Sequence, residues 1–234
     1  MKILNWRTLI MTVMIASLNV WRADAVEPTS AAAERVAEAA RVLNEVMAAP
    51  DKGIPRELLS EAHCVAIIPS LKKGGFIFGA EYGKGVVSCR RAGGTGWTGP
   101  STVRIEGGSF GFQIGGAATD LVLLVIDDRG AEKLMHSKFM LGGDATVAAG
   151  PVGRSAKAQT DATMNAKILA YSRSRGVFAG IALEGATLRP DNSDNRKLYS
   201  HDVKHKEILL GQVATPAACT ILIQTLNRYS SYEG

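Results

Sequence analysis

Apolar and polar residues alternate along the chain with two different periods. Over residues 30–49, apolar positions recur every three or four residues, and charged residues fill the positions between them. This period is typical of an amphipathic α-helix. Thr29 or Ser30 suits the N-cap of that helix, and Pro50 is expected to end it.

Short apolar runs separated by glycine, proline and polar residues dominate the middle of the chain, which is the pattern of β-strands and turns. We expect hairpin turns at residues 83–84, 107–108 and 175–176, because turn-forming residues there separate apolar runs. Pro69 is expected to stop the first of these runs. The expected strands lie at residues 64–68, 75–82, 85–89, 102–106, 109–114, 120–126, 145–149, 168–173 and 177–183.

Helical segments interrupt this region only briefly. Short helices are expected over residues 56–62 and 130–136, a polar loop over 190–197, and a final apolar helix over 216–229. Because strands follow strands through short turns, the sheet should be mostly antiparallel. The 25 glycines predict that it is strongly bent. The sequence therefore predicts one α+β domain over residues 26–234, with an N-terminal amphipathic helix, a short middle helix and a C-terminal packing helix.

The first 25 residues have the pattern of a secretory signal peptide. A basic start is followed by an apolar run over residues 8–20, which is shorter than the ~20 residues that a membrane span needs. Ala23-Asp24-Ala25 then supplies a small-x-small cleavage site. We expect cleavage after Ala25 and a periplasmic or secreted protein. An uncleaved membrane anchor is the alternative.

Composition and cysteine usage agree with an exported globular protein. Hydrophobic residues make up 46% of the chain, and its formal net charge is only +5, so nothing in it demands a nucleic-acid partner. Export would place the three cysteines in a compartment that permits disulfides. Cys64 begins one apolar run and Cys89 ends another, so a Cys64–Cys89 disulfide with Cys219 as a buried thiol is one alternative. Three buried thiols are the other.

The glycine-rich stretch KKGGFIFGAEYGKG, which begins at Lys72, resembles a phosphate-binding loop but lacks its spacing. Gly79 and Gly83 are separated by three residues instead of four, and Gly85 occupies the position of the required Ser or Thr. The residues that follow favour a strand, whereas such a loop opens into a helix. A nucleotide site is therefore not expected.

Two hydrolase-like patterns also lack their structural context. Ser109 lies in a G-x-S-x-G pattern, but the residues after it favour a strand where a nucleophile elbow requires a helix. Ser70 and Lys73 form S-x-x-K, and residues 193–195 form S-D-N, but no K-T-G element completes the penicillin-binding signature. We expect no enzyme, and a hydrolase is the third-ranked alternative.

Metal and cofactor sites are not expected either. His201 and His205 are four residues apart, which on a helix would give half of a metal site. His63 and His136 are the other histidines, and the chain contains neither H-E-x-x-H nor C-x-x-C. We interpret His201 and His205 as part of a solvated polar face.

Basic residues recur beside the expected strand ends and turns. In a bent sheet these ends can cluster on one rim, where they would attract phosphate headgroups at ~1 kcal/mol per charge. Ordinary solvated turn residues are the alternative interpretation. The candidates are Lys72, Lys73, Arg90, Arg91, Arg154, Lys157, Arg173 and Arg175.

Several motifs, in the same order, resemble the SYLF lipid-binding domain family, which is also called the yeast-type actin-binding domain family. The resemblance runs from about residue 36 to residue 199. Its motifs are CVAIIPSLKKGGF from Cys64, GWTGPS from Gly96, GSFGFQIGG from Gly108, GGDATVAAGPVGR from Gly142 and YSRSRGVFAG from Tyr171.

The resemblance implies binding of anionic phospholipids, through an amphipathic N-terminal helix and basic residues. Carried onto this chain, these are the helix over residues 30–49 and Lys72, Lys73, Arg154, Arg173 and Arg175. The export signal argues against actin and phosphoinositides as partners. We therefore expect a non-catalytic, membrane-associated domain that binds anionic phospholipid at an envelope membrane. The alternative is an envelope protein–protein interaction or structural module.

Overall fold

The structure, a computed structural model, describes residues 30–49, 53–75, 78–110, 117–152, 166–174, 177–180 and 185–230. Its strands are β1 (Cys64–Gly75), β2 (Phe78–Cys89), β3 (Ser101–Phe110), β4 (Ala117–Val125), β5 (Phe139–Met140), β6 (Val147–Ala149), β7 (Ile168–Ser174), β8 (Val177–Gly180) and β9 (Thr187–Pro190). Its helices are α1 (Ala31–Met47), α2 (Arg56–Glu61), α3 (Asp128–Leu134), α5 (Asn192–Tyr199), α6 (His205–Leu209), the short 3₁₀ helix η3 (Ala217–Cys219) and α7 (Thr220–Ser230).

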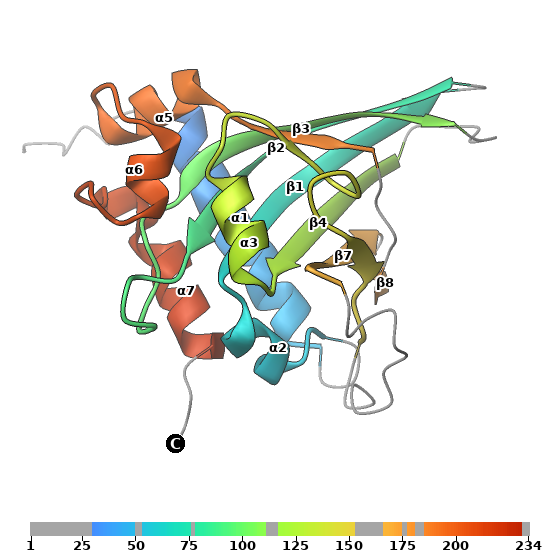
Figure 1. The fold of residues 1–234 in the computed structure, drawn as a ribbon, viewed down its shortest axis with the longest axis horizontal. Helices are drawn as coiled ribbons and strands as arrows, with labels where there is room; N and C mark the ends of the chain where they lie inside the picture. Colours follow the sequence, from blue (N-terminus) through green and yellow to red (C-terminus); the bar gives the residue numbers. More distant parts are fainter. Residues whose placement is uncertain are drawn as a thin grey trace, which may run out of the picture.

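The described strands form one nine-stranded sheet in the order β5-β9-β3-β2-β1-β4-β7-β6, with β8 paired to β7. The pairing of β6 with β7 is parallel, and the other pairings among these strands are antiparallel. The long strands β2 and β3 extend well beyond the helices that cover the sheet (Figure 1). The predicted α+β class, with a mostly antiparallel sheet and helices at both ends of the chain, is confirmed.

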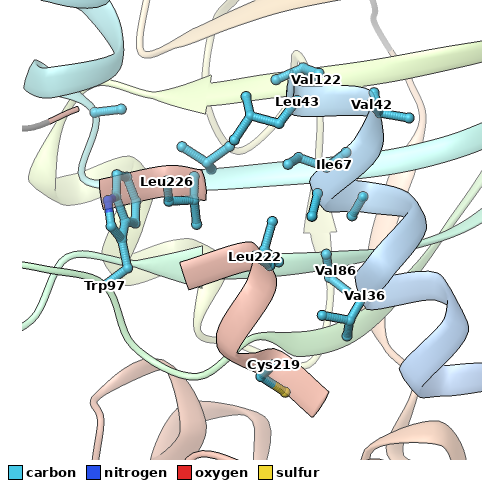
Figure 2. Close-up of a cluster of buried hydrophobic side chains, with 14 of the residues drawn as sticks. Val36, Val42, Leu43, Ile67, Val86, Trp97, Val122, Cys219, Leu222 and Leu226 are labelled. Carbon is cyan, nitrogen blue, oxygen red and sulfur yellow. The ribbon is translucent and has the colours of Figure 1, made fainter. Parts of the chain in front are cut away.

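One face of the sheet is covered by α1 and α7. The Ser30 hydroxyl caps α1 by accepting a hydrogen bond from the Ala33 N–H. Figure 2 shows the apolar side of α1 facing the sheet, with two leucines of α7 completing the cluster. Burial of each such side chain stabilises the fold by about 1.5–3 kcal/mol. The labelled members of this core are Val36, Val42, Leu43, Ile67, Val86, Trp97, Val122, Cys219, Leu222 and Leu226.

The opposite face of the sheet buries a second apolar cluster. It contains β-strand residues such as Ile68, Leu71 and Ile105, and it is closed by Leu134 of α3 and by Phe139. Alternate side chains of β1 therefore lie in two different cores. This explains why the apolar run over residues 64–68 is continuous. The predicted helices over 30–49, 56–62, 130–136 and 216–229 are confirmed as α1, α2, α3 and η3–α7.

Three predicted strand breaks are wrong, because β1, β2 and β3 are each continuous. β1 passes Pro69 through a register irregularity at Ser70, whose φ is +55°. Gly83 and Gly85 lie inside β2 under this irregularity, and a Cβ on Gly85 would approach the Ile67 carbonyl oxygen to 2.2 Å. These glycines therefore permit close approach of two strands and do not form a turn.

Residues 107–108 likewise lie within β3, opposite Glu81 and Ala80 of β2. A Cβ on Gly107 would come within 2.8 Å of a Glu81 carboxylate oxygen. The predicted polar loop over 190–197 is also wrong, because α5 occupies most of it. The Asp191 side chain caps this helix by accepting from the Asp194 N–H. The hairpin expected from 168–173 and 177–183 is present as the antiparallel pair β7–β8.

Cys64 and Cys89 are directly opposite each other in β1 and β2 and form a disulfide. Cys219 is a buried thiol, and burial raises the pKa of that thiol to about 12. The expected signal peptide lies outside the described residues. Among the helices that the structure describes, none has the length and apolar character to cross a membrane.

Candidate functional site

Four of the predicted basic residues lie toward opposite ends of the β1–β2 pair. Arg90 and Arg91 follow directly after Cys89, at the disulfide end. Lys72 and Lys73 lie in the other half of β1, opposite Tyr82 and Glu81. The structure therefore does not gather these residues on one rim.

Arg90 is held inside the protein by backbone carbonyls. Its guanidinium donates hydrogen bonds to the carbonyl oxygens of Leu59, Ser60, Ala62 and Ser230, at 3.0–3.3 Å. It also lies 4.2 Å from the centre of the Trp97 ring. Arg90 thus joins α2 and the end of α7 to the sheet, which is a structural role that the sequence did not reveal.

Arg91 and Arg173 also have partners within the protein, but of different kinds. Arg91 is exposed, and its Nε donates to the Trp97 carbonyl at 3.0 Å. Arg173 is largely buried between two acids: it pairs with Asp120 at 2.5 Å and also with Glu45. These two carboxylates offset the Arg173 charge, so this residue is poorly placed to bind a headgroup.

The remaining candidates include four positions whose side chains are not described. Lys73 has a described backbone within β1, but its side chain lies outside the described structure. Arg154, Lys157 and Arg175 lie wholly outside the described residues. Their predicted role in lipid binding stays a prediction.

A groove of about 570 Å³ lies between the first half of α1 and the β1–β2 pair. Its walls come from α1, β1 and β2. Lys72 therefore lies in the same groove as Arg35 and Lys84, two cations that the sequence did not single out. The lining residues are Ala31, Glu34, Arg35, Glu38, Pro69, Ser70, Lys72, Tyr82, Gly83 and Lys84.

Two of the three groove cations are already paired with acids of α5 and its cap. Lys84 Nζ lies 2.7 Å from Asp191 and 2.9 Å from Asp194, and hydrogen bonds to these carboxylates raise its pKa. Arg35 lies 2.9 Å from Asp194. Burial opposes ionisation of Asp194, but Lys84 and Arg35 hold its pKa below the usual value. This network ties α1, β2 and α5 together.

Lys72 is the groove cation that stays open to solvent. It is exposed, and it makes no ion pair with any residue that the structure describes. Its cross-strand partner Tyr82 is 46% exposed, although most large hydrophobic side chains in the described sheet are buried. A lysine beside an exposed tyrosine is an arrangement suited to a membrane interface. Tyr82 could have been found from the sequence, since it alternates with Lys84 on one face of a strand.

The structure also contains a Ser–His contact, but both residues are buried. Ser101 Oγ and His205 Nδ1 are 2.7 Å apart, and His205 Nε2 lies 3.0 Å from the Leu134 carbonyl. Asn195 donates to Ser101 at 2.9 Å, which satisfies the hydroxyl. His205 was expected on a solvated face; it is instead buried, and burial lowers its pKa to about 4. A substrate cannot reach a pair enclosed in this way, so the contact is structural.

No group of three or more metal-ligating side chains occurs among the described residues. The described part of the chain does contain a groove lined by an exposed lysine and an exposed tyrosine, and a buried Ser–His–Asn network.

Comparison with known proteins places this fold in a family. Residues 106–229, more than half of the chain, match the family Ysc84, described as "Las17-binding protein actin regulator". The chain belongs to the Ysc84 family. This is the family that the SYLF resemblance indicated.

Similar proteins from animals and yeast cover most of the chain. The "SH3 domain-containing YSC84-like protein 1" of Rattus norvegicus is 37% identical over 205 residues, which are 86% of this chain and 60% of the rat protein. The human protein of the same name is 36% identical over 205 residues, or 59% of its length. "Protein YSC84" of Saccharomyces cerevisiae is 36% identical over 186 residues, which are 78% of this chain and 39% of the yeast protein.

The chain thus spans about 40% to 60% of the length of these curated relatives. The names of the rat and human relatives describe SH3-containing proteins, and the family description names an actin regulator; none of these names an enzyme. The similarity therefore supports a binding domain and indicates no catalytic family.

Proposed function

We propose that this protein is a non-catalytic domain that binds the surface of an anionic phospholipid membrane. The observation that carries this proposal is the exposed pair of Lys72 and Tyr82 in the groove beside α1. Lys72 supplies a positive charge without a described counter-ion, and Tyr82 supplies an amphipathic ring.

The physical chemistry of this pair favours shallow docking. A lysine near an anionic surface contributes about 1 kcal/mol, and a tyrosine ring is stabilised at the level of the headgroups. Such binding is weak at high salt, because salt screens exposed charges beyond about a Debye length.

Deep insertion of α1 is not part of this proposal. The apolar face of α1 is buried against the sheet and α7, including Val36, Leu43 and Val46. Exposing that face would uncover the core of the domain. The structure thus supports docking by the groove and the projecting strands, with α1 as a support for the groove.

The proposal is tested by flotation with vesicles of phosphatidylcholine alone or with added phosphatidylglycerol. We expect the protein to float with the anionic vesicles at low salt, to bind less at high salt, and to stay in solution with neutral vesicles. Equal binding to both vesicle types, or binding to neither, would overturn the proposal.

The second candidate function is a protein–protein interaction module. It is favoured by the description of the family, which names a protein partner and actin regulation. In that case the protein should retain a defined partner after detergent extraction of all lipid. Vesicle flotation and partner retention are measured on the same preparation, so the two functions can be separated.

We also propose that the chain is exported and cleaved after Ala25, as the signal-peptide pattern predicts. N-terminal sequencing of the protein from its native host should then begin at Val26. A mature chain that begins at Met1 would favour the uncleaved anchor.

A further inference from the structure

Three cationic residues form one row across neighbouring strands. Lys84 of β2 lies opposite Arg104 of β3, and Arg104 lies opposite Arg189 of β9. Directly opposed residues in antiparallel strands project from the same face of the sheet, and like charges in such positions repel each other. A row of three cations therefore requires compensation.

The first two cations of the row are compensated by nearby acids. Lys84 pairs with Asp191 and Asp194, as described above. Arg104 Nε lies 2.7 Å from a carboxylate oxygen of Glu106. Each of these two cations thus has a carboxylate partner that offsets its charge and accepts a hydrogen bond from at least one of its N–H groups.

Arg189 differs from both. It makes no ion pair with any described residue, and its Nε is buried without a hydrogen-bond acceptor in the described structure. Leaving a buried charged donor unsatisfied costs about 1–3 kcal/mol or more. Among the described residues Arg189 is therefore the cation of this row that lacks an acceptor, and an anionic ligand in a neighbouring pocket would supply one.

A pocket of about 320 Å³ lies where the two arginines meet α5. Arg104 and Arg189 line it together with Ser137, Asn192 and Ser193. Asn192 and Ser193 are the first two residues of α5, where N–H groups have no acceptor within the helix.

Asp191 also lines this pocket and is the acidic residue among its described walls. Both of its carboxylate oxygens are engaged elsewhere. One pairs with Lys84 at 2.7 Å, and the other accepts from the Asp194 N–H at 3.2 Å. The Asp191 charge is therefore offset by Lys84, as the Arg104 charge is by Glu106, and Arg189 gives the pocket its positive character.

We propose that this pocket binds the phosphate group of a small ligand through Arg104 and Arg189. Guanidinium groups present paired N–H donors that match the oxygens of a phosphate. The volume of the pocket is at the lower end of the range for ligand sites, which suits a small phosphate compound or a single headgroup. The proposal does not depend on lipid docking at Lys72, because the pocket shares no residue with the groove that contains Lys72.

The experiment is a calorimetric titration of the full chain with inorganic phosphate, against chloride at matched ionic strength. The wild-type protein should bind phosphate specifically. Arg189→Gln and, independently, Arg104→Gln should each weaken binding by about tenfold or more, as expected for loss of a charge-assisted hydrogen bond. Arg196→Gln is the matched control, because Arg196 lies on α5 but does not line the pocket, is 65% exposed and pairs with Asp202.

A wild-type response to phosphate no larger than that to chloride would overturn the proposal, and this result does not depend on the folding of any variant. Equal weakening by Arg196→Gln would also overturn it. Flotation of the same variants with anionic vesicles then assigns the source of the phosphate. Loss of flotation in Arg189→Gln and in Arg104→Gln, but not in Arg196→Gln, supports a lipid headgroup in the pocket, and unchanged flotation supports a soluble phosphate compound.

Discussion

The two ends of the β1–β2 pair carry similar basic residues in different surroundings. At one end, the Cys64–Cys89 disulfide, Arg90 and Trp97 form a closed region in which Arg90 is surrounded by carbonyl oxygens. At the other end, Lys72 and Tyr82 are exposed at the groove beside α1. We refer to these as the closed end and the open end.

The difference shows that the surroundings of a basic residue decide its role. Arg90 satisfies backbone carbonyls of two helices, so its removal should affect folding. Lys72 has no described partner, so its removal should affect binding and leave folding nearly unchanged.

Removal of the disulfide should have the largest effect on stability. The two cysteines are 25 residues apart, and closing a loop of that length stabilises a protein by about 3.5 kcal/mol in the chain-entropy account. We expect the Cys64→Ala/Cys89→Ala protein to lose that free energy of unfolding, measured by urea denaturation. Vesicle binding by the folded fraction should be unchanged, because the open end is not altered. A loss of binding without a loss of stability would contradict the assignment of the two ends.

Arg90→Ala should destabilise the protein by about 3 kcal/mol, because it leaves several carbonyls of α2 and α7 without a charged donor. Arg90→Lys should cost less, since an ammonium keeps the charge but reaches fewer of these carbonyls. Urea denaturation at neutral pH measures both. Lys72→Ala is the matched control and should change stability by less than about 0.5 kcal/mol. Equal destabilisation by Arg90→Ala and Lys72→Ala would remove the distinction between the ends.

Acid should destabilise the folded protein through His205. Its folded pKa is about 4, below the ordinary value of about 6.5 that applies when unfolded. The unfolded chain therefore binds the extra proton between these pH values, and stability falls as pH drops from about 6.5 toward 4. We expect His205 to account for a loss of about 2.5 kcal/mol between pH 7 and pH 4.5.

The measurement is urea denaturation of the wild type and His205→Gln at both pH values. The variant should be less stable at pH 7 but should lack this part of the pH dependence. Identical pH dependence in the two proteins would show that His205 does not remain neutral in the folded state.

Periodicity predicted much of this fold because its signals are local. The amphipathic spacing of α1, the cap at Ser30 and the apolar run of β4 were read correctly from neighbouring residues. Gly83 and Gly107 were misread as turns. Because these glycines have no side chain, residues distant in the sequence can approach them closely. Ile68 and Leu71 lie against Gly83, and Glu81 and Ala186 lie against Gly107.

The candidate site was less predictable for the same reason. Lys72 and Arg90 are each followed by another basic residue near a glycine, and nothing local distinguishes them. The role of Arg90 depends on carbonyl oxygens at α2 and α7. Arg189, whose Nε has no acceptor in the described structure, lies opposite Arg104 on the neighbouring strand. Both depend on contacts that form only in the folded sheet. The solvated position predicted for His205 is wrong because its partners, Ser101 and Leu134, come from other elements.

The central claim is that the open end binds anionic membranes through Lys72. The most direct test compares Lys72→Glu with Lys206→Glu, a charge reversal at an exposed lysine of α6, in flotation with phosphatidylglycerol vesicles at low salt. Lys72→Glu replaces an attraction of about 1 kcal/mol with a repulsion of similar size, so binding should weaken by about thirtyfold. Lys206→Glu should bind like the wild type. Equal weakening by the two variants would show that only net charge matters, and unchanged binding by Lys72→Glu would contradict the account.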